Sequence, residues 1–473
     1  MKKKILLAAS AALLLAACSE SMNDLGEIAP DNAKPTDEKT VVLSPEELCL
    51  VKQIANKTPK ISPETAQETA MQLLGIQPQT SSLTKKMSAT VFCNKKQVYN
   101  SLTKSYKQED DTAFYVFNTP DDQGFAIVAA DVRVPNQVLA YSDHGNFDLN
   151  SDNLITELFI ELAKDYVLEN IVTAETQEDS LTKSICQKLG IEIKNMNPNS
   201  LTKAKELMRI KCTNVGLPKI TTINKGEAKP LLTTKWKQRA PYNNLCNDHP
   251  AGCVPIAIAQ ILNYWQKPAN LNGLTINWKH ISMNNEYNND FRNAVSKLIL
   301  QIRTEVHTDD YGGTYKNNAV AFFRNHHFTN QTKFNNYEYN QVADALEHGR
   351  PVYMGAFCNE GGHAWVADGS VIREVITEQT FKYCIVEQED DGTITDRYED
   401  ITSTTNKLYE LLHFNWGWGG TADGYFDKKL FDTRKPLVET AYGDFVQQNY
   451  QNIGPKYLFN KQIETITDIY PRY

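Results

Sequence analysis

The chain has 473 residues, which is more than one ordinary domain holds, so we expect two or three domains. Hydrophobic residues make up 41% of it and charged residues 22%, a balance typical of soluble proteins with packed cores. Its formal net charge is −8, and this acidic balance argues against nucleic acid as the main partner.

The first 17 residues have the pattern of an export signal. Three lysines, Lys2 to Lys4, precede an apolar run over 5–15, which is shorter than the roughly 20 residues that a membrane-spanning helix needs. The run ends in Leu-Ala-Ala before Cys18, which resembles a bacterial lipobox, so we expect Cys18 to carry lipid. The alternative is an ordinary secretory signal in which Cys18 is incidental. We therefore expect an exported lipoprotein at the periplasmic or cell surface, anchored by lipid alone, with release of the mature domain left open.

Residues 18–44 are rich in Asp, Glu, Asn, Pro and Ser, a composition that predicts a flexible tether. Of the nine cysteines, no two form a C-x-x-C pair, so neither a zinc ribbon nor a dense disulfide framework is indicated. An exported protein can still form disulfides, and the spacing leaves their pairing open.

The segment 45–215 has the mixed pattern of an α+β domain without an evident active site. Ser44 and Ser62 each precede Pro and acidic residues, which is a helix-start signature. The pattern predicts helices after these two serines and over 152–171, and strands over 112–118, 124–130 and 137–141. Residues 216–229 are rich in lysine and lack clear hydrophobic periodicity, so we interpret them as a linker to a domain over 230–473.

The stretch around Cys253 predicts a helix that begins at a cysteine. Apolar residues at 254, 258, 261, 262 and 265 recur with helical spacing after Gly252. Pro255 fits only in the first turn, where a missing N–H costs little. A cysteine at a helix N-terminus is favoured as the thiolate by the unpaired N–H groups and the helix dipole. Cys253 is therefore a candidate nucleophile.

Three other places in this half could complete a cysteine site. Gln238 lies upstream of Cys253, where its amide could donate to a developing oxyanion together with the Cys253 N–H. His363 follows two glycines at the start of a predicted strand, and a base far away in sequence can pair with a cysteine in the fold. A polar side chain in the segment around Asn415 and Trp416 could orient the imidazole while tryptophan excludes water.

The rest of this half is predicted to be structural. We expect helices over 289–303, 318–324 and from 341, and a hairpin whose strands, 381–386 and 393–398, flank Asp391-Gly392.

Taken together, these segments resemble the streptopain peptidases of the papain-like superfamily. The resemblance covers 236–242, Gly252 to Gln260, Gly361 to Ala364, 415–420 and the C-terminal 459–462. Residues 124–131 and 138–142 also look like that family's propeptide. The stretch 371–410 is longer than the resemblance leads us to expect.

The resemblance implies an α+β, papain-like two-lobed domain at 230–473, with a helical lobe and an antiparallel sheet lobe, behind a smaller prodomain at 45–215 and an activation linker at 216–229. It implies Cys253 as nucleophile, His363 as base and Gln238 as oxyanion donor, with Asn415 and Trp416 supporting the histidine. Protein or peptide substrates, the chain's own propeptide as inhibitor, and no metal or organic cofactor follow from it.

Two other functions stay open. A transglutaminase-like acyltransferase would use the same Cys–His pair, but expects a carboxylate where this chain has Asn415. A catalytically weak or inactive surface lipoprotein that binds a protein partner would not need cysteine, histidine and glutamine together.

Overall fold

The computed structural model describes residues 39–56, 58–74, 88–100, 105–119, 122–149, 154–189, 213–214, 219–358, 361–388, 394–432 and 459–472. Its helices are α1 Pro45–Asn56, α2 Pro63–Leu74, α3 Leu154–Leu189, α5 Cys253–Trp265, α6 Trp278–Ile281, α7 Asn289–Glu305, α8 Lys316–Asn325, α9 Tyr339–Glu347 and the 3₁₀ helix η3 Lys428–Phe431. Its strands are β1 Lys39–Val42, β2 Ser88–Asn100, β3 Ser105–Asn118, β4 Phe125–Ala129, β5 Val138–Ser142, β6 Thr213–Asn214, β7 Lys219–Ala228, β8 Asn270–Leu271, β9 Leu274–Thr275, β10 Asn335–Asn336, β11 Val352–Cys358, β12 Gly361–Gln388, β13 Ile394–Asn415, β14 Gly424–Asp427 and β15 Phe459–Ile466.

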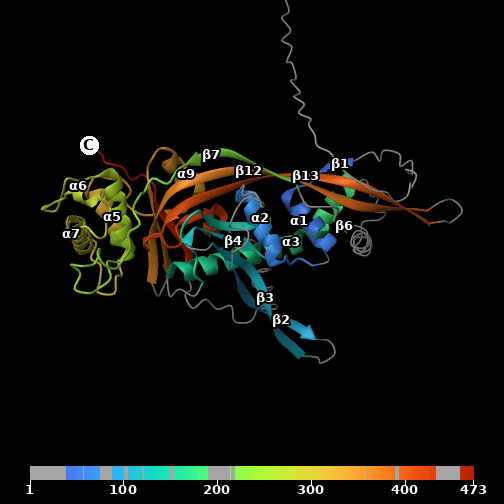
Figure 1. Cartoon of the computed structure of the whole chain (residues 1–473), viewed down its shortest axis with the longest axis horizontal. Helices are drawn as coiled ribbons and strands as arrows, with labels where there is room; N and C mark the ends of the chain where they lie inside the picture. The colour runs from blue at the N-terminus through green and yellow to red at the C-terminus, as the bar shows by residue number, and fades with distance from the viewer. Residues whose placement is uncertain are drawn as a thin grey trace, which may run out of the picture. The chain divides into compact units, whose positions relative to one another are not determined.

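One large sheet joins the two halves of the chain. Its strands follow the order β10-β15-β11-β12-β13-β14-β5-β4-β3-β2, and β1, β6 and β7 pair beside this path. Neighbours along the path pair antiparallel, whereas β1 runs parallel to β13. Figure 1 shows β12 and β13 running together as one long orange pair. Helices with an antiparallel sheet confirm the expected α+β class.

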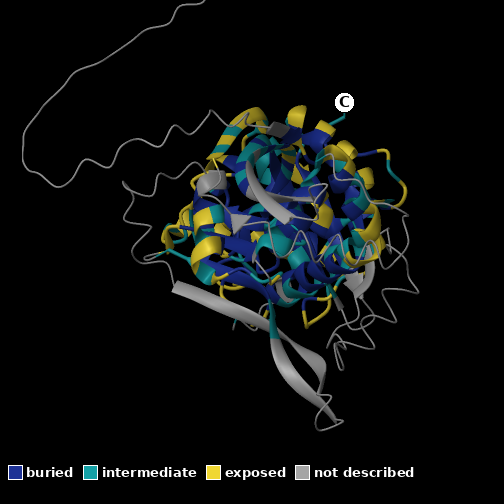
Figure 2. Ribbon diagram, turned by 90° about the vertical axis from the view of Figure 1, so that its right-hand side faces the viewer, coloured by how far each residue is buried: buried dark blue, intermediate teal, exposed yellow. Residues whose placement is uncertain are grey.

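Strand β12 separates two hydrophobic cores because successive side chains point to opposite faces of a strand. Ala364 and Val366 pack with the apolar face of α5 in a core that also includes α7 and α8. Trp365 and Ala367 face a second core, which α3 shares with the sheet. Figure 2 shows the buried residues gathered in the interior, with exposed residues on the outward sides of the helices. His363 therefore lies on a strand between the helical core and the sheet core.

The predicted helix starts in the N-terminal half are confirmed. The Ser44 N–H donates to Glu47 Oε2 at 2.6 Å, and the Glu47 N–H donates to Ser44 Oγ at 3.1 Å, so a reciprocal capping box opens α1. Glu47 also accepts hydrogen bonds from Ser184 Oγ and Lys188 Nζ, each at 2.5 Å. Glu47 thereby ties α1 to the last turns of α3.

Three sequence interpretations are wrong in extent. The helix predicted over 152–171 continues to Leu189, because Ile185 and Cys186 are buried against α1. The predicted linker 216–229 contains strand β7, which pairs with β12. Its side chains are mostly exposed and only Ile220 packs against a core, so its sequence lacks a strong apolar pattern.

The third case is the tether. Residues 39–42, at the end of the predicted tether 18–44, form β1 against β13. The signal segment 1–17 and Cys18 lie outside the described residues. The predicted hairpin is confirmed, but its strands β12 and β13 are much longer than the sequence pattern predicted.

Candidate active site

Cys253 is the first residue of α5, as the sequence predicted. Gly252 immediately before it has φ 88° and ψ 141°, a backbone conformation that side chains disfavour. Pro255 occupies the third helical position, where its missing N–H removes no helical hydrogen bond. The turn into the helix is held from outside by Arg303 of α7, which donates to the Pro250 carbonyl at 2.5 Å. These features fix where the cysteine side chain begins.

The Cys253 thiol is partly buried and faces β12. The Ala364 N–H lies close enough to the sulfur to favour the thiolate, as do the N–H groups of Val254 and of Cys253 itself. Burial nevertheless dominates and raises the pKa of the Cys253 thiol above its ordinary value. The helix start alone thus does not give the lowered thiol pKa that the sequence suggested, because the neighbouring strand and core remove water from the sulfur.

His363 directly precedes Ala364 and is buried. Its Nε2 lies 3.0 Å from the Trp416 carbonyl oxygen. Because a carbonyl only accepts, Nε2 must carry the proton, and Nδ1 is left as the basic nitrogen of the neutral ring. Burial lowers the pKa of His363 to about 4, against the opposing effect of the Trp416 carbonyl. The ring is therefore neutral at pH 7 in this form of the chain.

Tryptophans surround the His363 ring. Trp365 is parallel to it within 6° at a centroid distance of 6.1 Å, and Trp416 and Trp418 each lie 6.3 Å away. Trp365 and Trp416 have no exposed surface. This aromatic shell keeps water from the bond between the imidazole and the Trp416 carbonyl. Among the described residues, no hydrogen bond joins the Cys253 thiol to the His363 ring.

Gln238 lies beside the start of α5. The Gln238 carbonyl accepts a hydrogen bond at 2.9 Å from the N–H of Ala251, which is two residues before Cys253 in the chain. The Gln238 side chain is partly buried.

The hydrogen bonds described for the Asn415 side chain go to Gln260, Gly417 and Thr234 rather than to His363, so its support of the imidazole stays a prediction. Its Oδ1 accepts hydrogen bonds from Gln260 Nε2 at 2.9 Å and from the Gly417 N–H at 3.1 Å. Its Nδ2 donates to the Thr234 carbonyl at 2.7 Å. His363 is instead hydrogen-bonded to the backbone carbonyl of Trp416. A bond to a backbone atom cannot be predicted from a pattern of side chains.

Sequence reasoning missed two buried carboxylates near this loop. Asp423 accepts the Trp416 N–H at 2.8 Å, and burial raises its pKa to about 7 against that donor. Asp368 lies 2.6 Å from His413 Nδ1. Burial lowers the pKa of His413, but the Asp368 carboxylate outweighs this and the pKa is raised overall. Asp423 fixes the backbone that holds His363; its only signal in the sequence is its place after the tryptophan–glycine loop.

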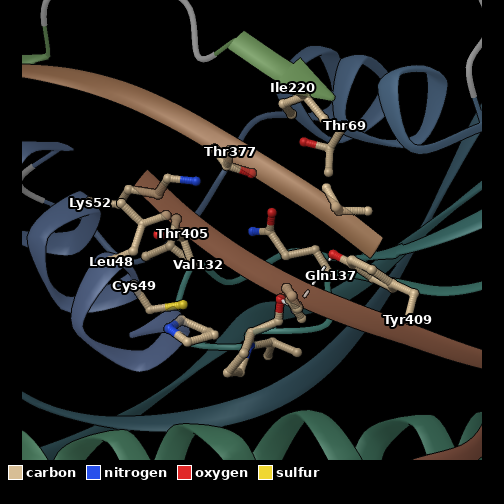
Figure 3. A pocket seen from close by; sticks show the side chains of 15 residues that line it. Leu48, Cys49, Lys52, Thr69, Val132, Gln137, Ile220, Thr377, Thr405 and Tyr409 are labelled. Carbon is tan, nitrogen blue, oxygen red and sulfur yellow. Dashed lines mark hydrogen bonds between the residues drawn. The ribbon is translucent and has the colours of Figure 1, made fainter. Parts of the chain in front are cut away.

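A cavity of about 100 Å³ lies elsewhere, between the N-terminal half and the β12–β13 pair. Figure 3 shows Cys49 and Lys52 of α1 on one side of it, with Thr377, Thr405 and Tyr409 from the long strands. None of the five candidate catalytic residues lines this cavity. Separately, no helix in the described part of the chain has the length and apolarity needed to cross a bilayer.

The chain is similar in sequence to known proteases and to a protease inhibitor. The sequence model of the Peptidase C10 family matches residues 236–426, and that of the Spi protease inhibitor matches residues 58–167. Streptopain of Streptococcus pyogenes is 25% identical over 359 residues, covering 66% of this chain and 73% of that protein. The thiol protease/hemagglutinin PrtT of Porphyromonas gingivalis is 22% identical over 407 residues, covering 75% of this chain and 39% of that protein.

Two solved structures from Prevotella intermedia were also found. A prointerpain A fragment is 18% identical with a TM-score of 0.42, covering 81% of this chain and all 100% of that one. Active wild-type interpain A is 21% identical with a TM-score of 0.32, covering 52% of this chain and 96% of that one. By its matches in sequence, this chain carries a Peptidase C10 (streptopain) family domain at 236–426 behind a Spi-inhibitor-like region at 58–167, and these matches identify it as a cysteine endopeptidase.

Proposed function

We propose that this chain is an exported, lipid-anchored zymogen whose C-terminal domain hydrolyses peptide bonds with Cys253 and His363. The observation that carries the proposal is the hydrogen bond from His363 Nε2 to the Trp416 carbonyl, at 3.0 Å. This bond leaves His363 Nδ1 as the base. The next residue, Ala364, places its N–H against the Cys253 sulfur.

The chemistry then follows from these positions. His363 Nδ1 takes the thiol proton, and the Cys253 sulfur bonds to the substrate carbonyl carbon. The Cys253 N–H and the Gln238 amide donate to the resulting oxyanion. The protonated imidazole gives its proton to the leaving amine as the C–N bond breaks. Water then hydrolyses the thioester, which releases the acid and restores the thiol. A carbonyl partner for Nε2 speaks against the transglutaminase alternative, which expects a carboxylate there.

The prodomain supports latency of this pair. Strand β5 pairs with β14, with Tyr141 opposite Tyr425 and Ala140 opposite Phe426. The rings of Tyr141 and Tyr425 are stacked, with centroids 5.2 Å apart. In the full-length chain, burial raises the pKa of Cys253 and lowers the pKa of His363 to about 4, which favours the uncharged pair at pH 7. We propose that removal of the prodomain admits water and substrate and permits the charged pair.

Activation requires a cut between the two halves. We expect it within 204–212 or 215–218, outside β6 and before β7 begins at Lys219, because a strand paired with β12 does not fit a protease cleft as a free extended peptide. In a self-processing enzyme, Cys253→Ala stays full length while the wild type shortens. An active form whose N-terminus lies before residue 180 contradicts this boundary.

The nucleophile is tested by labelling the activated protein with a thiol-directed peptide epoxide and locating the modified residue. We expect modification of Cys253 alone and full labelling of a Cys246→Ala control, since Cys246 is a buried free cysteine nearby in sequence. Modification elsewhere, or casein cleavage by Cys253→Ala, refutes the assignment.

The lipid anchor rests on the signal pattern before Cys18. Cys18→Ser should move the protein from the membrane fraction to the soluble fraction and remove the acyl mass from the mature N-terminus. A Cys18→Ser protein that keeps its membrane association contradicts the lipoprotein assignment.

A further inference from the structure

Gln260 is a fully buried polar residue on the helix that begins with Cys253. It lies seven residues along α5, which is about two helical turns, so it projects from the same side of the helix as Cys253. Its Oε1 accepts hydrogen bonds from Thr234 Oγ1 at 2.7 Å and from the Trp236 N–H at 3.4 Å. Its Nε2 donates to Asn415 Oδ1 at 2.9 Å.

These bonds form a closed network. Asn415 Nδ2 donates back to the Thr234 carbonyl at 2.7 Å, so Gln260, Asn415 and Thr234 each bond to both of the others. The Gly417 N–H also donates to Asn415 Oδ1, at 3.1 Å. Turning the Gln260 amide over would direct its NH₂ group at the Trp236 N–H and its oxygen at Asn415 Oδ1. The orientation of the amide is therefore fixed by its partners.

The three residues belong to the three segments that carry the candidate catalytic groups. Gln260 is on the helix of Cys253, and Thr234 is four residues before Gln238. Asn415 directly precedes Trp416, whose carbonyl holds His363. We propose that Gln260 is a positioning residue: it holds the nucleophile helix, the oxyanion segment and the histidine-holding loop in one geometry. This inference rests on the proposed function.

A positioning role predicts a loss in turnover rather than in substrate binding. Reacting groups displaced by about 1 Å can lose about 10²-fold in rate. Gln260 has no exposed surface with which to touch substrate, so KM should stay near that of the wild type. The expected signature is therefore a fall in kcat of about 10²-fold with little change in KM.

Gln260→Glu separates positioning from simple packing. An ionised glutamate still accepts from Thr234 and Trp236, but it has no proton to donate to Asn415 Oδ1. When protonated, the same carboxyl can donate. The ratio of variant to wild-type kcat should therefore be low at neutral pH and rise as the pH falls through the pKa of the introduced carboxyl.

Two controls accompany this variant in the activated enzyme. Gln260→Met fills similar space but neither donates nor accepts through an amide, so its kcat ratio should stay low at every pH. Gln266→Glu makes the same chemical change at the exposed end of α5, where the Gln266 side-chain amide donates to Ser282 Oγ, and its kcat ratio should stay near one. Urea denaturation followed by tryptophan fluorescence verifies that each variant is folded.

The proposal is supported if the kcat ratio of Gln260→Glu to wild type rises in acid, while the ratio for Gln260→Met stays constant and KM is unchanged in both variants. Equal ratios for Glu and Met at all pH values, or parallel changes in KM, overturn it. If Gln260→Glu does not fold, the kinetics of Gln260→Met decide. A lower kcat with unchanged KM in that variant supports positioning, whereas a wild-type kcat refutes it. Cys253→Ala in the same assay separates the outcomes: if that variant is active, the proposed function fails instead.

Discussion

Replacing Gly252 by alanine tests whether the turn before Cys253 is set by close packing. Its φ of 88° lies in a region that costs a non-glycine residue about 1–3 kcal/mol. An added Cβ would also lie 2.9 Å from the Gly312 carbonyl oxygen and 3.0 Å from Thr308 Cγ2. Overpacking of this kind typically costs a further 1–3 kcal/mol or so. We expect Gly252→Ala to lower the free energy of unfolding by about 2–6 kcal/mol.

Gly273→Ala is the matched control. Its φ of 91° is nearly the same, but a Cβ there meets nothing within 4 Å, so only the backbone cost applies. Urea denaturation followed by tryptophan fluorescence suits the comparison, because all six tryptophans lie beyond residue 235 and report on the C-terminal half. Gly252→Ala should be the less stable variant by about 1–3 kcal/mol. Equal stabilities would refute the packing argument.

Further predictions concern the catalytic pair and the prodomain. Cys253→Ala and His363→Ala should each abolish nearly all casein cleavage, and the double variant should be no worse; additive losses would contradict a single catalytic unit. Gln238→Ala should keep measurable activity with kcat lowered about 10²–10³-fold, so complete loss would argue against an oxyanion role. In the full-length chain, Cys253 alkylation should rise with pH through a midpoint above the ordinary thiol value of about 8.5, because burial raises its pKa; a midpoint near neutrality is inconsistent with this. Burial raises the pKa of Glu47, but its hydrogen bonds outweigh burial and lower the pKa overall. Glu47→Gln should therefore lower the free energy of unfolding by about 1–3 kcal/mol at pH 7. The difference from the wild type should shrink as the pH falls through the lowered pKa of Glu47. Urea unfolding at several pH values checks this, and a pH-independent difference contradicts it.

Short-range signals explain which parts were predictable. The start of α5 was predicted because Gly252, Pro255 and the apolar spacing after Cys253 all act within a few residues. The capping box of α1 was predicted for the same reason. Strand β7 was missed because its stability comes from pairing with β12, which lies more than a hundred residues later in the chain.

The site shows the same limit. Gln238, Cys253 and His363 could be named from residue type and context, but the atom that holds His363 is a backbone carbonyl, which every residue possesses. The role of Asn415 stays a prediction, and its hydrogen-bond partners Gln260 and Thr234 are distant in sequence, so no local pattern could have indicated them. The thiol pKa depends on how much water the folded chain removes, which no local motif encodes.

The pairing of β5 with β14 makes cutting the chain and freeing the enzyme two different events. A break before Lys219 severs one covalent bond, but it leaves the main-chain pairing at Tyr141 and Tyr425 and the parallel contact of β1 with β13 untouched. Under the proposed activation, the product of the first cut would be a nicked complex whose latency ends as its fragments dissociate. Dilution would favour the separated fragments because it slows their reassociation, and digestion of the separated fragment would make the release irreversible. Dissociation also uncovers the hydrogen-bonding edge of β14, so the freed protease gains an open strand that its precursor kept covered.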